Sequence, residues 1–407
     1  MSIEQLESKL EEFRVTFFGD DFVWRKGQKE AAIEIVNAYY NKTKTVILDA
    51  PVGSGKSIIG MAVAWVLNQE NKTGYILASD LSLQEQYEKD FNRSNFRWGS
   101  IKGIDNYICV DNMEKNSLGT CRIRNKPARR MPCYSSCPYY TAREIAANSP
   151  TSLLNYAYWL IMMNYVYPTM GDESIFKPRD FTICDEGHKI LDIVQNHYSP
   201  RFDPKTIEKL EKLTHFFALY KLHDHIKDFH QIKNDILSLY KTEDQDELHE
   251  ILTEIKLNLQ CNYRNTWEKF KNKVNEDYPH DDPPKEWKEA LRLCDWVKDL
   301  HCKIDDYNDI VDKTSTRNIV KNPTGQNELT FNCLEESYMM HKYFHQSTGF
   351  TVLMSATFAD PSKYLRSIAL GSAKYIKMDS HFDFTKSPIY FYNKKRMTWN
   401  QIAGNLP

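Results

Sequence analysis

The fold of this chain is decided by residues 45–57, which are TVILDAPVGSGKS in one-letter code. Residues 45–48 are apolar or β-branched and indicate a buried strand. Residues 50–57 form a turn with two glycines that ends in Gly-Lys-Ser, where a helical pattern begins. This order of strand, turn and helix is typical of a loop that binds phosphate groups.

The residue types in this loop suit phosphate chemistry. Gly53 and Gly55 let backbone N–H groups curl around phosphate oxygens. Lys56 can reach the β- and γ-phosphates, and the Ser57 hydroxyl can bind Mg²⁺ at the positive end of the following helix. Ala50 stands where the fullest form of the loop has its first glycine. The alternative is an ordinary glycine-containing turn, but the complete order favours a phosphate loop.

A second segment, Asp185-Glu186-Gly187-His188, follows the apolar run 181–184. Acidic residues at the end of a parallel strand face the phosphate loop in open α/β sheets. We expect Asp185 to hold Mg²⁺ and Glu186 to polarise the attacking water. An acidic pair alone is usually solvated surface, so its weight comes from the loop at 50–57.

Two weaker signals flank these segments. Arg25 and Gln28 precede a helical pattern, and the Gln28 amide can offer a donor and an acceptor to an adenine edge. Alone they would be an ordinary helix start. Ser355 and Thr357 close an apolar strand, and with His188 they could couple the nucleotide site to a neighbouring domain. Alone they would be a strand end.

A strand–turn–helix unit recurs along the chain. Apolar runs at 45–48, 75–78, 152–154, 181–184 and 350–354 are each followed by a turn or helical pattern, and residues 1–40 have helical spacing. Strands that alternate with helices predict an α/β fold with a parallel sheet covered on both faces. Residues 99–148 and 200–313 interrupt the rhythm, and the second stretch is charged, helical and carries an apolar stripe typical of a helix-bundle core.

Composition sets broad limits. The 407 residues suggest two to four domains, and a net charge of −2 means that any basic surface must be local. No segment resembles a signal peptide or a membrane span, which predicts a soluble, intracellular, cytoplasmic protein without a membrane partner. Nine cysteines in such a protein favour thiols or metal ligands over disulfides.

Four of the cysteines, Cys109, Cys121, Cys133 and Cys137, lie in the first interruption. Four thiolates can hold a [4Fe–4S] cluster or a tetrahedral Zn²⁺, or they can be free thiols. Their spacing is not diagnostic, and the spacing alone favours Zn²⁺.

The same interruption has a local basic surface. Its candidate DNA contacts are Arg122, Arg124, Arg129, Arg130 and the aromatic Tyr139, with Lys126 close by. Basic side chains contact phosphates and aromatic rings stack on the bases of single strands. The alternative is a solvated positive loop.

Taken in order, these segments resemble the motif series of superfamily 2 helicases, in the branch that contains DinG and XPD. The resemblance rests on Arg25 and Gln28, the phosphate loop, LSLQEQ at 81–86, the DEAH-like segment at 185–188 and Ser-Ala-Thr at 355–357. The segments KGIDNYIC at 102–109 and NYAY at 155–158 sharpen it. It covers nearly the whole chain.

The resemblance implies a RecA-like P-loop domain with two inserts. It implies ATP–Mg²⁺ binding by Arg25, Gln28, Gly53, Ser54, Gly55, Lys56, Ser57 and Asp185, with Lys56, Asp185 and Glu186 catalytic. It also implies that the four cysteines hold a [4Fe–4S] cluster. The expected boundaries are 1–98, 151–199 and 336–385 for the RecA-like domain, 99–150 for the iron–sulfur insert, 200–335 for a helical arch, and 386–407 for a linker and the start of a second domain.

The implied activity is that of an ATP-dependent 5′→3′ DNA helicase, acting as a monomer on single-stranded or forked DNA. The sequence shows no motifs of the second RecA-like domain that such enzymes need. We therefore expect this chain alone to bind ATP–Mg²⁺ and DNA but to hydrolyse and unwind poorly. An RNA helicase, a translocase and a non-catalytic DNA-binding fragment are the alternatives.

Overall fold

A computed structural model describes residues 2–92, 97–124, 126–221, 226–279, 282–313, 320–325, 328–333, 335–358 and 360–380. The predicted linker and truncated helix at 386–407 lie outside these ranges.

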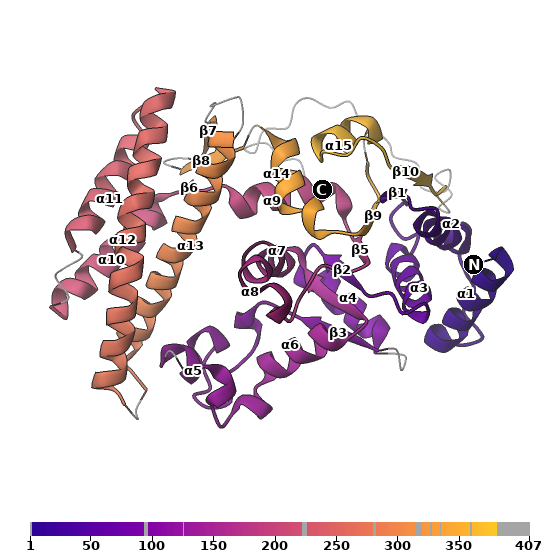
Figure 1. Cartoon of the computed structure of the whole chain (residues 1–407), viewed down its shortest axis with the longest axis horizontal. Coiled ribbons are helices and arrows are strands. Elements are labelled where there is room, and N and C mark those ends of the chain that lie inside the picture. Colours follow the sequence, from indigo (N-terminus) through magenta and orange to yellow (C-terminus); the bar gives the residue numbers. More distant parts are fainter. Residues whose placement is uncertain are drawn as a thin grey trace, which may run out of the picture.

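The centre of the molecule is a seven-stranded sheet in which every pair of neighbours is parallel (Figure 1). In spatial order its strands are β10 (Lys374–Lys377), β1 (Thr45–Asp49), β9 (Phe350–Ser355), β5 (Phe181–Cys184), β2 (Gly74–Ala78), β4 (Thr151–Asn155) and β3 (Trp98–Ile101). The five predicted strands are all present and form the middle of the sheet. The sequence analysis missed β3 and β10, which are four residues each and lie at the two edges.

Both faces of the sheet are buried, which confirms the α/β prediction. Val46 and Leu48 belong to one apolar cluster, whereas Ile47 between them belongs to another. Successive strand residues point to opposite faces, so the two clusters are the two sides of the sheet. The flanking helices are α1 (Ile3–Phe18), α2 (Gln28–Tyr40), α3 (Lys56–Gln69), α4 (Leu81–Phe91), α6 (Pro138–Asn148), α7 (Tyr156–Ile161), α8 (Tyr167–Met170), α9 (Ile190–Tyr198), α14 (Glu336–Tyr343) and α15 (Pro361–Ser367).

Helix α3 shows how the sequence places the phosphate loop. Residues 59–67 of this helix are all buried. Each large apolar side chain buried there contributes about 1.5–3 kcal/mol, so the helix that follows the loop is fixed against the sheet. Gly60 permits this contact, because a Cβ there would lie 3.0 Å from the Met354 side chain of β9.

The first insert leaves the sheet after β3 and returns through α6 to β4. It consists mainly of short turns of 3-10 helix, at Ile104–Asn106, Asn116–Leu118, Ala128–Arg130 and Tyr134–Ser136, with one short α-helix, α5 (Thr120–Ile123). Gly99 of β3 allows close packing on α6, because an added Cβ would lie 2.5 Å from the Ala146 Cα. The insert is therefore anchored at both ends to one edge of the sheet.

The second insert lies between α9 and α14. Four long helices, α10 (Pro204–Leu219), α11 (Ile226–Leu239), α12 (Gln245–Asp277) and α13 (Lys285–Lys313), form a bundle beside the sheet domain (Figure 1). The predicted apolar stripe on α13, from Trp287 to Val311, is buried in this bundle.

The region predicted as a helical arch also contains strands. A three-stranded antiparallel sheet is formed by β6 (Arg201–Phe202), β8 (Glu328–Asn332) and β7 (Val320–Gly325), and Phe202, Leu329 and Phe331 belong to the apolar cluster of the bundle. The two-residue β6 is too short to give a sequence pattern. The alternation of buried Leu329 and Phe331 with half-buried neighbours in β8 is a strand signal that the sequence analysis overlooked.

Candidate functional site

The phosphate loop connects β1 to α3 and has the backbone shape that its glycines predict. Gly53 and Gly55 have φ values of 76° and 78°, in the left-handed region. A Cβ at Gly55 would lie 2.2 Å from the Gln28 Nε2 atom. Glycine at position 55 is therefore required both by the backbone conformation and by the neighbouring side chain.

Gln28 and Arg25 both contact this loop, which the sequence analysis did not foresee. The fully buried Gln28 amide donates from Nε2 to the Ser54 carbonyl at 2.7 Å and accepts from the Arg25 N–H at 2.8 Å. The Arg25 guanidinium donates to the Gly53 carbonyl. In this structure one end of the Gln28 amide supports the loop and the other holds Arg25, and recognition of adenine by Gln28 stays a prediction.

Two polar groups of the loop could still form hydrogen bonds to a bound anion. The Ser54 hydroxyl is buried and has no hydrogen-bond partner among the described residues. The Lys56 ammonium lies 3.5 Å from the Ala50 carbonyl, a long and weak contact. Buried polar atoms are normally satisfied, so this hydroxyl and this ammonium fit a loop that receives phosphate oxygens.

Asp185 ends β5 and is held in one orientation. Its side chain is 2% exposed; Oδ2 accepts from the Tyr87 hydroxyl and Oδ1 from the Glu186 N–H, both at 2.9 Å. Burial raises the pKa of this carboxyl, and the hydrogen bonds from Tyr87 and Glu186 oppose that shift. A carboxylate fixed in this way fits the predicted role of a Mg²⁺ ligand.

Glu186 has a strained backbone at the position where the predicted chemistry occurs. Its φ of 51° and ψ of 44° place a non-glycine residue in the left-handed region. Such strain costs on the order of 1 kcal/mol and is concentrated at functional sites. The next residue, Gly187, packs on β9, because a Cβ there would lie 3.2 Å from the Leu353 Cα.

His188, Ser355 and Thr357 converge beside the acidic pair. His188 Nδ1 lies 2.6 Å from the Ser355 hydroxyl and 3.3 Å from Glu186 Oε2. The same hydroxyl accepts from the Thr357 N–H at 3.1 Å, and the Ser355 carbonyl accepts from the Ala50 N–H at 2.8 Å. Ser355 therefore links the acidic segment to the first residue of the phosphate loop.

The sequence analysis missed Tyr87. This side chain, on α4, is fully buried; its hydroxyl donates to Asp185 at 2.9 Å, and Ser57 lies near it. In the sequence it is one of several aromatic residues at helical spacing, a pattern that indicates only a buried face. Nothing local to α4 distinguishes it from a core tyrosine.

The four cysteines of the first insert are unpaired thiols; Cys109, Cys121 and Cys137 are buried and Cys133 is half-buried. Burial raises the pKa of the Cys121 thiol, and the nearby Cys109 and Cys137 raise it further. Burial also raises the pKa of Cys133, with Cys109 and Cys121 among its neighbours. The four thiols thus share one neighbourhood, although within the described ranges no three His, Cys, Asp or Glu side chains are close enough to hold an ion together.

The predicted DNA contacts of this insert have different environments. Arg122, Arg129 and Arg130 are exposed. Arg124 instead donates to the Pro279 carbonyl at 2.8 Å and so ties the insert to the end of α12. The Tyr139 ring is 6% exposed and packs edge-on against Tyr107 and Tyr140, so its faces are largely covered.

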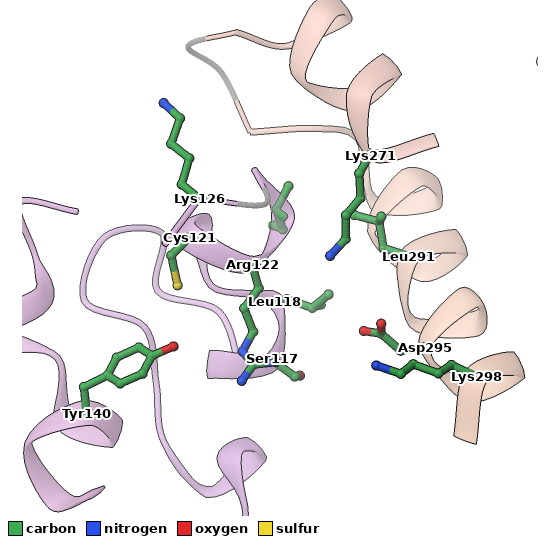
Figure 2. A pocket seen from close by; sticks show the side chains of 11 residues that line it. Ser117, Leu118, Cys121, Arg122, Lys126, Tyr140, Lys271, Leu291, Asp295 and Lys298 are labelled. Atoms are coloured by element: carbon green, nitrogen blue, oxygen red, sulfur yellow. The ribbon is translucent and has the colours of Figure 1, made fainter. Parts of the chain in front are cut away.

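Two cavities lie between the insert and the helical bundle. The smaller, of about 290 Å³, is lined on the insert side by Arg122 and Lys126 and on the bundle side by Lys271, Lys298 and Asp295 (Figure 2). Burial lowers the pKa of Lys271 to about 8, and the nearby cations Arg122 and Lys298 act in the same direction.

The larger cavity, of about 820 Å³, shares Arg122, Asp295 and Lys298 with the smaller one and extends to Asn155 and Tyr158 of the sheet domain. Together the two cavities bring the insert, the bundle and the sheet domain around one cation-lined space.

Comparison with known families identifies the class of the sheet domain. Residues 21–220 match the model described as "Type III restriction enzyme, res subunit", ResIII. This range contains the phosphate loop and the acidic segment. The chain therefore contains a helicase-type NTPase motor domain.

Two solved structures are similar to this chain at low sequence identity and low TM-score. "Structure of S. tokodaii Xpd4" is 14% identical with a TM-score of 0.46, over 87% of this chain and 61% of that one. "Truncated XPD" is 13% identical with a TM-score of 0.45, over 86% of this chain and 99% of that one. The chain thus spans about 61% of the Xpd4 chain's length. A comparison with curated proteins finds no match.

None of the helices in the described part of the chain is both long and apolar enough to cross a lipid bilayer.

Proposed function

We propose that this chain is the nucleotide-binding half of an ATP-dependent DNA helicase of the DinG/XPD branch, with 5′→3′ polarity. The observation that carries the proposal is the convergence of three distant segments at the carboxyl edge of the sheet. The loop at 50–57, the acidic segment at 185–188 and the strand end at 355–357 are joined by the contacts of Ser355 with Ala50 and His188. This edge is where open α/β sheets bind ligands.

Each residue of this edge has a defined role in the proposed ATP site. The loop N–H groups and Lys56 hold the β- and γ-phosphates, and Ser57 and Asp185 hold Mg²⁺. Glu186 orients the attacking water. His188 and Ser355 transmit changes in the position of Asp185 and Glu186 to the phosphate loop. Bound Mg²⁺ neutralises the charge that develops on the transferred phosphoryl group.

We place the remaining catalytic groups on a second RecA-like domain. An arginine that stabilises the transition state contributes about 10³–10⁵ in rate where it has been measured. The chain alone is therefore proposed to bind ATP more readily than it hydrolyses it.

The first insert is proposed to hold a [4Fe–4S] cluster through Cys109, Cys121, Cys133 and Cys137. The support is that these four thiols lie in one insert, three of them buried, with Cys109 and Cys137 near Cys121 and with Cys109 and Cys121 near Cys133. Four thiolates are the ligand set of such a cluster. Zn²⁺ is the alternative occupant.

The cation-lined space between insert, bundle and sheet domain is the proposed path of single-stranded DNA. Arg122, Lys126, Lys271 and Lys298 supply positive charge to a chain whose net charge is −2. Cations contact the phosphate backbone, so the predicted binding weakens steeply with salt. Because Tyr139 is covered and Arg124 binds Pro279, we assign the backbone contacts chiefly to the exposed Arg122, Arg129 and Arg130.

The nucleotide site is tested by the affinity of a fluorescent ATP analogue for Lys56→Ala. Loss of a charge-assisted contact to phosphate should weaken binding more than about tenfold. Lys72→Ala is the matched control, since Lys72 is surface-exposed and lies 4.0 Å from Asp180, outside the proposed site. Unchanged affinity in Lys56→Ala would refute the assignment.

The nucleic-acid assignment is tested by titrating labelled single-stranded DNA and RNA of one sequence at several salt concentrations. Arg122→Ala with Arg130→Ala should weaken DNA binding and reduce the salt dependence. Tighter binding of RNA than of DNA would favour the RNA-helicase alternative instead.

A further inference from the structure

Helix α4 connects the proposed Mg²⁺ ligands of the nucleotide site to the first insert. At one end of this connection, the Tyr87 hydroxyl donates to Asp185 Oδ2 at 2.9 Å, and Ser57 lies near the same hydroxyl. Asp185 and Ser57 are the two groups that the proposed function assigns to Mg²⁺. Tyr87 thus bonds one proposed metal ligand and neighbours the other.

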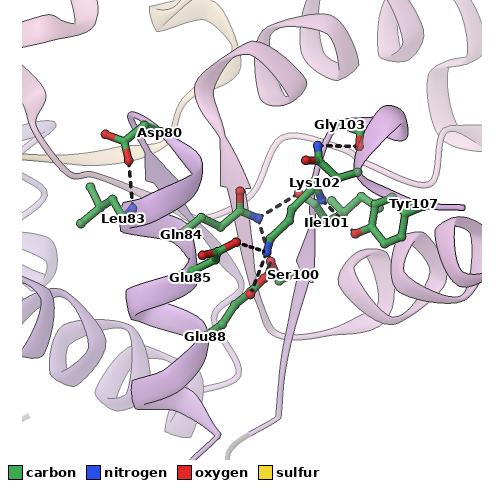
Figure 3. A network of polar contacts seen from close by, with 11 residues as sticks. Asp80, Leu83, Gln84, Glu85, Glu88, Ser100, Ile101, Lys102, Gly103 and Tyr107 are labelled. Carbon is green, nitrogen blue, oxygen red and sulfur yellow. Dashed lines mark hydrogen bonds and ion pairs between the residues drawn. The ribbon is translucent and has the colours of Figure 1, made fainter. Parts of the chain in front are cut away.

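Helix α4 also holds the first residues of the insert (Figure 3). The Lys102 ammonium lies 3.3 Å from Glu85 and 3.1 Å from Glu88. The Gln84 amide donates to the Ser100 hydroxyl at 2.7 Å and to the Ile101 carbonyl at 3.1 Å. Five polar side chains therefore join α4 to the end of β3, where the insert begins.

The connection continues to a cysteine. The Lys102 N–H donates to the Tyr107 hydroxyl at 3.1 Å, and the Tyr107 carbonyl accepts from the Asn116 N–H at 2.8 Å. The Asn116 side chain in turn donates to Cys137 Sγ at 3.4 Å. Hydrogen bonds, the body of α4 and the backbone of the insert thus run without a break from Asp185 to a proposed cluster ligand.

The geometry of α4 makes this connection stiff. Gln84, Tyr87 and Phe91 are buried on one face, and the helix is capped by Asp80, whose carboxylate accepts from the Leu83 N–H at 2.9 Å. Glu88, one of the two carboxylates that bind Lys102, follows Tyr87 directly in the helix. A displacement of Tyr87 along the helix axis would therefore also displace Glu88 and, with it, Lys102. A short, packed helix moves as a unit more readily than it bends.

We propose that α4 couples metal-bound nucleotide to the iron–sulfur insert, with Tyr87 as a positioning residue for Asp185 and Lys102 as the contact on the insert. The inference rests on the proposed nucleotide site. Binding of Mg²⁺ would draw on the Asp185 carboxylate that Tyr87 contacts, so occupancy of the site would change this contact and α4 would carry the change to the insert.

The test uses the complete chain and two measured affinities. The first is the affinity for a fluorescent ATP analogue, with Mg²⁺ and with a chelator instead. The second is the affinity for labelled single-stranded DNA, with and without a non-hydrolysable ATP analogue. The ratio of the two DNA affinities is the coupling factor.

Tyr87→Phe removes one hydroxyl and should weaken analogue binding about two- to tenfold with Mg²⁺ and little without it. Lys102→Met should leave analogue affinity unchanged. Both variants should move the coupling factor toward one, and the double variant should move it no further than the larger single effect, since the two residues act in series.

Tyr75→Phe is the matched control, because this buried tyrosine donates to the Lys177 carbonyl at 2.7 Å, away from the site. It should behave as wild type in both measurements. A thermal melt of each variant reports folding, and the half-buried Lys102 tests the connection independently if Tyr87→Phe folds poorly.

The inference is overturned if the wild-type coupling factor is one, or if Tyr87→Phe and Lys102→Met both keep the wild-type factor. If Lys56→Ala abolishes analogue binding while these two variants match wild type, only the coupling fails. If wild type itself binds no analogue, the nucleotide site and the coupling fail together.

Discussion

The nucleotide edge and the cysteine insert are built in opposite ways. At the nucleotide edge, polar residues are already held by protein groups: Gln28 supports the loop, and Tyr87 with a backbone N–H fixes Asp185. In the insert, burial and neighbouring thiols disfavour the thiolate form of Cys121, which is the form that binds metal. A site at strand ends is thus assembled by the sheet, whereas the proposed cysteine site should depend on the metal group that we propose it binds.

The largest expected effect follows from removing that group. Stripping the metal with a chelator, or introducing Cys137→Ser, should make residues 102–148 sensitive to protease while nucleotide binding persists. Structural metals contribute on the order of 10 kcal/mol to the domains they fold. Limited proteolysis and visible absorbance would measure the loss.

Cys302→Ser is the control, because Cys302 lies on α13, outside the insert. If the insert stays resistant to protease without metal, the insert does not need a metal group for its fold. The proposed difference between the nucleotide edge and the insert would then be wrong. One Zn²⁺ per chain in colourless protein would replace the cluster with the alternative ion.

The second-largest effect is expected from a substitution inside the phosphate loop itself. Gly55→Ala places a methyl group 2.2 Å from Gln28 Nε2 at a φ of 78°, so it should cost about 1–3 kcal/mol of stability and distort the loop. Nucleotide affinity should fall at least about tenfold, as titration of a fluorescent ATP analogue would show. Gly103→Ala, at the start of the insert, meets only Asn106 at 3.5 Å and should be tolerated. Equal tolerance at both positions would mean that the loop is not preassembled.

A third, smaller effect concerns the joint between the bundle and the sheet domain. Asp306 of α13 accepts from Tyr165 and, at 3.0 Å, from the Tyr343 hydroxyl. Burial raises the pKa of Asp306, which the two tyrosines and Lys342 oppose. Because the folded state holds this proton more tightly, the contribution of Asp306 to stability is greatest in acid and is lost as pH rises through its folded pKa.

Asp306→Asn should therefore remove part of the pH dependence. The unfolding free energy of wild type relative to the variant should fall with rising pH, by no more than about 1.4 kcal/mol per pH unit. Denaturant titrations at several pH values would measure this difference. A difference that does not change with pH would show that Asp306 titrates alike in both states.

The smallest effect is expected at Arg124, which joins the insert to the bundle. Arg124→Ala removes the hydrogen bond to the Pro279 carbonyl and should cost about 0.5–1.5 kcal/mol in thermal or denaturant unfolding. If Arg124 contacts DNA instead, this variant would weaken DNA binding as much as Arg122→Ala. The two variants together decide which of the predicted arginines face the strand.

The central strands and the site residues that follow them could be predicted from the sequence. The spacing of apolar residues and the short motifs that mark these positions can each be recognised within a few consecutive residues. Lys56, Asp185 and Ser355 could be assigned to one edge because parallel strands end together. The roles of Tyr87, Arg124 and Gln28 could not be predicted, because each depends on a partner that is distant in the chain. Strands β6 and β8 pair across more than 120 residues, and only the fold brings them together.

The order of the strands also affects how this chain emerges from the ribosome. Strand β1, which carries the phosphate loop, pairs with β9 in a register that joins Thr45 to Thr351. Its other partner, β10, is later still. Until those residues are synthesised, the apolar strand that defines the molecule has both edges open, a state that favours slow folding and aggregation. Strand β1 therefore stays without its sheet partners until most of the chain has been made.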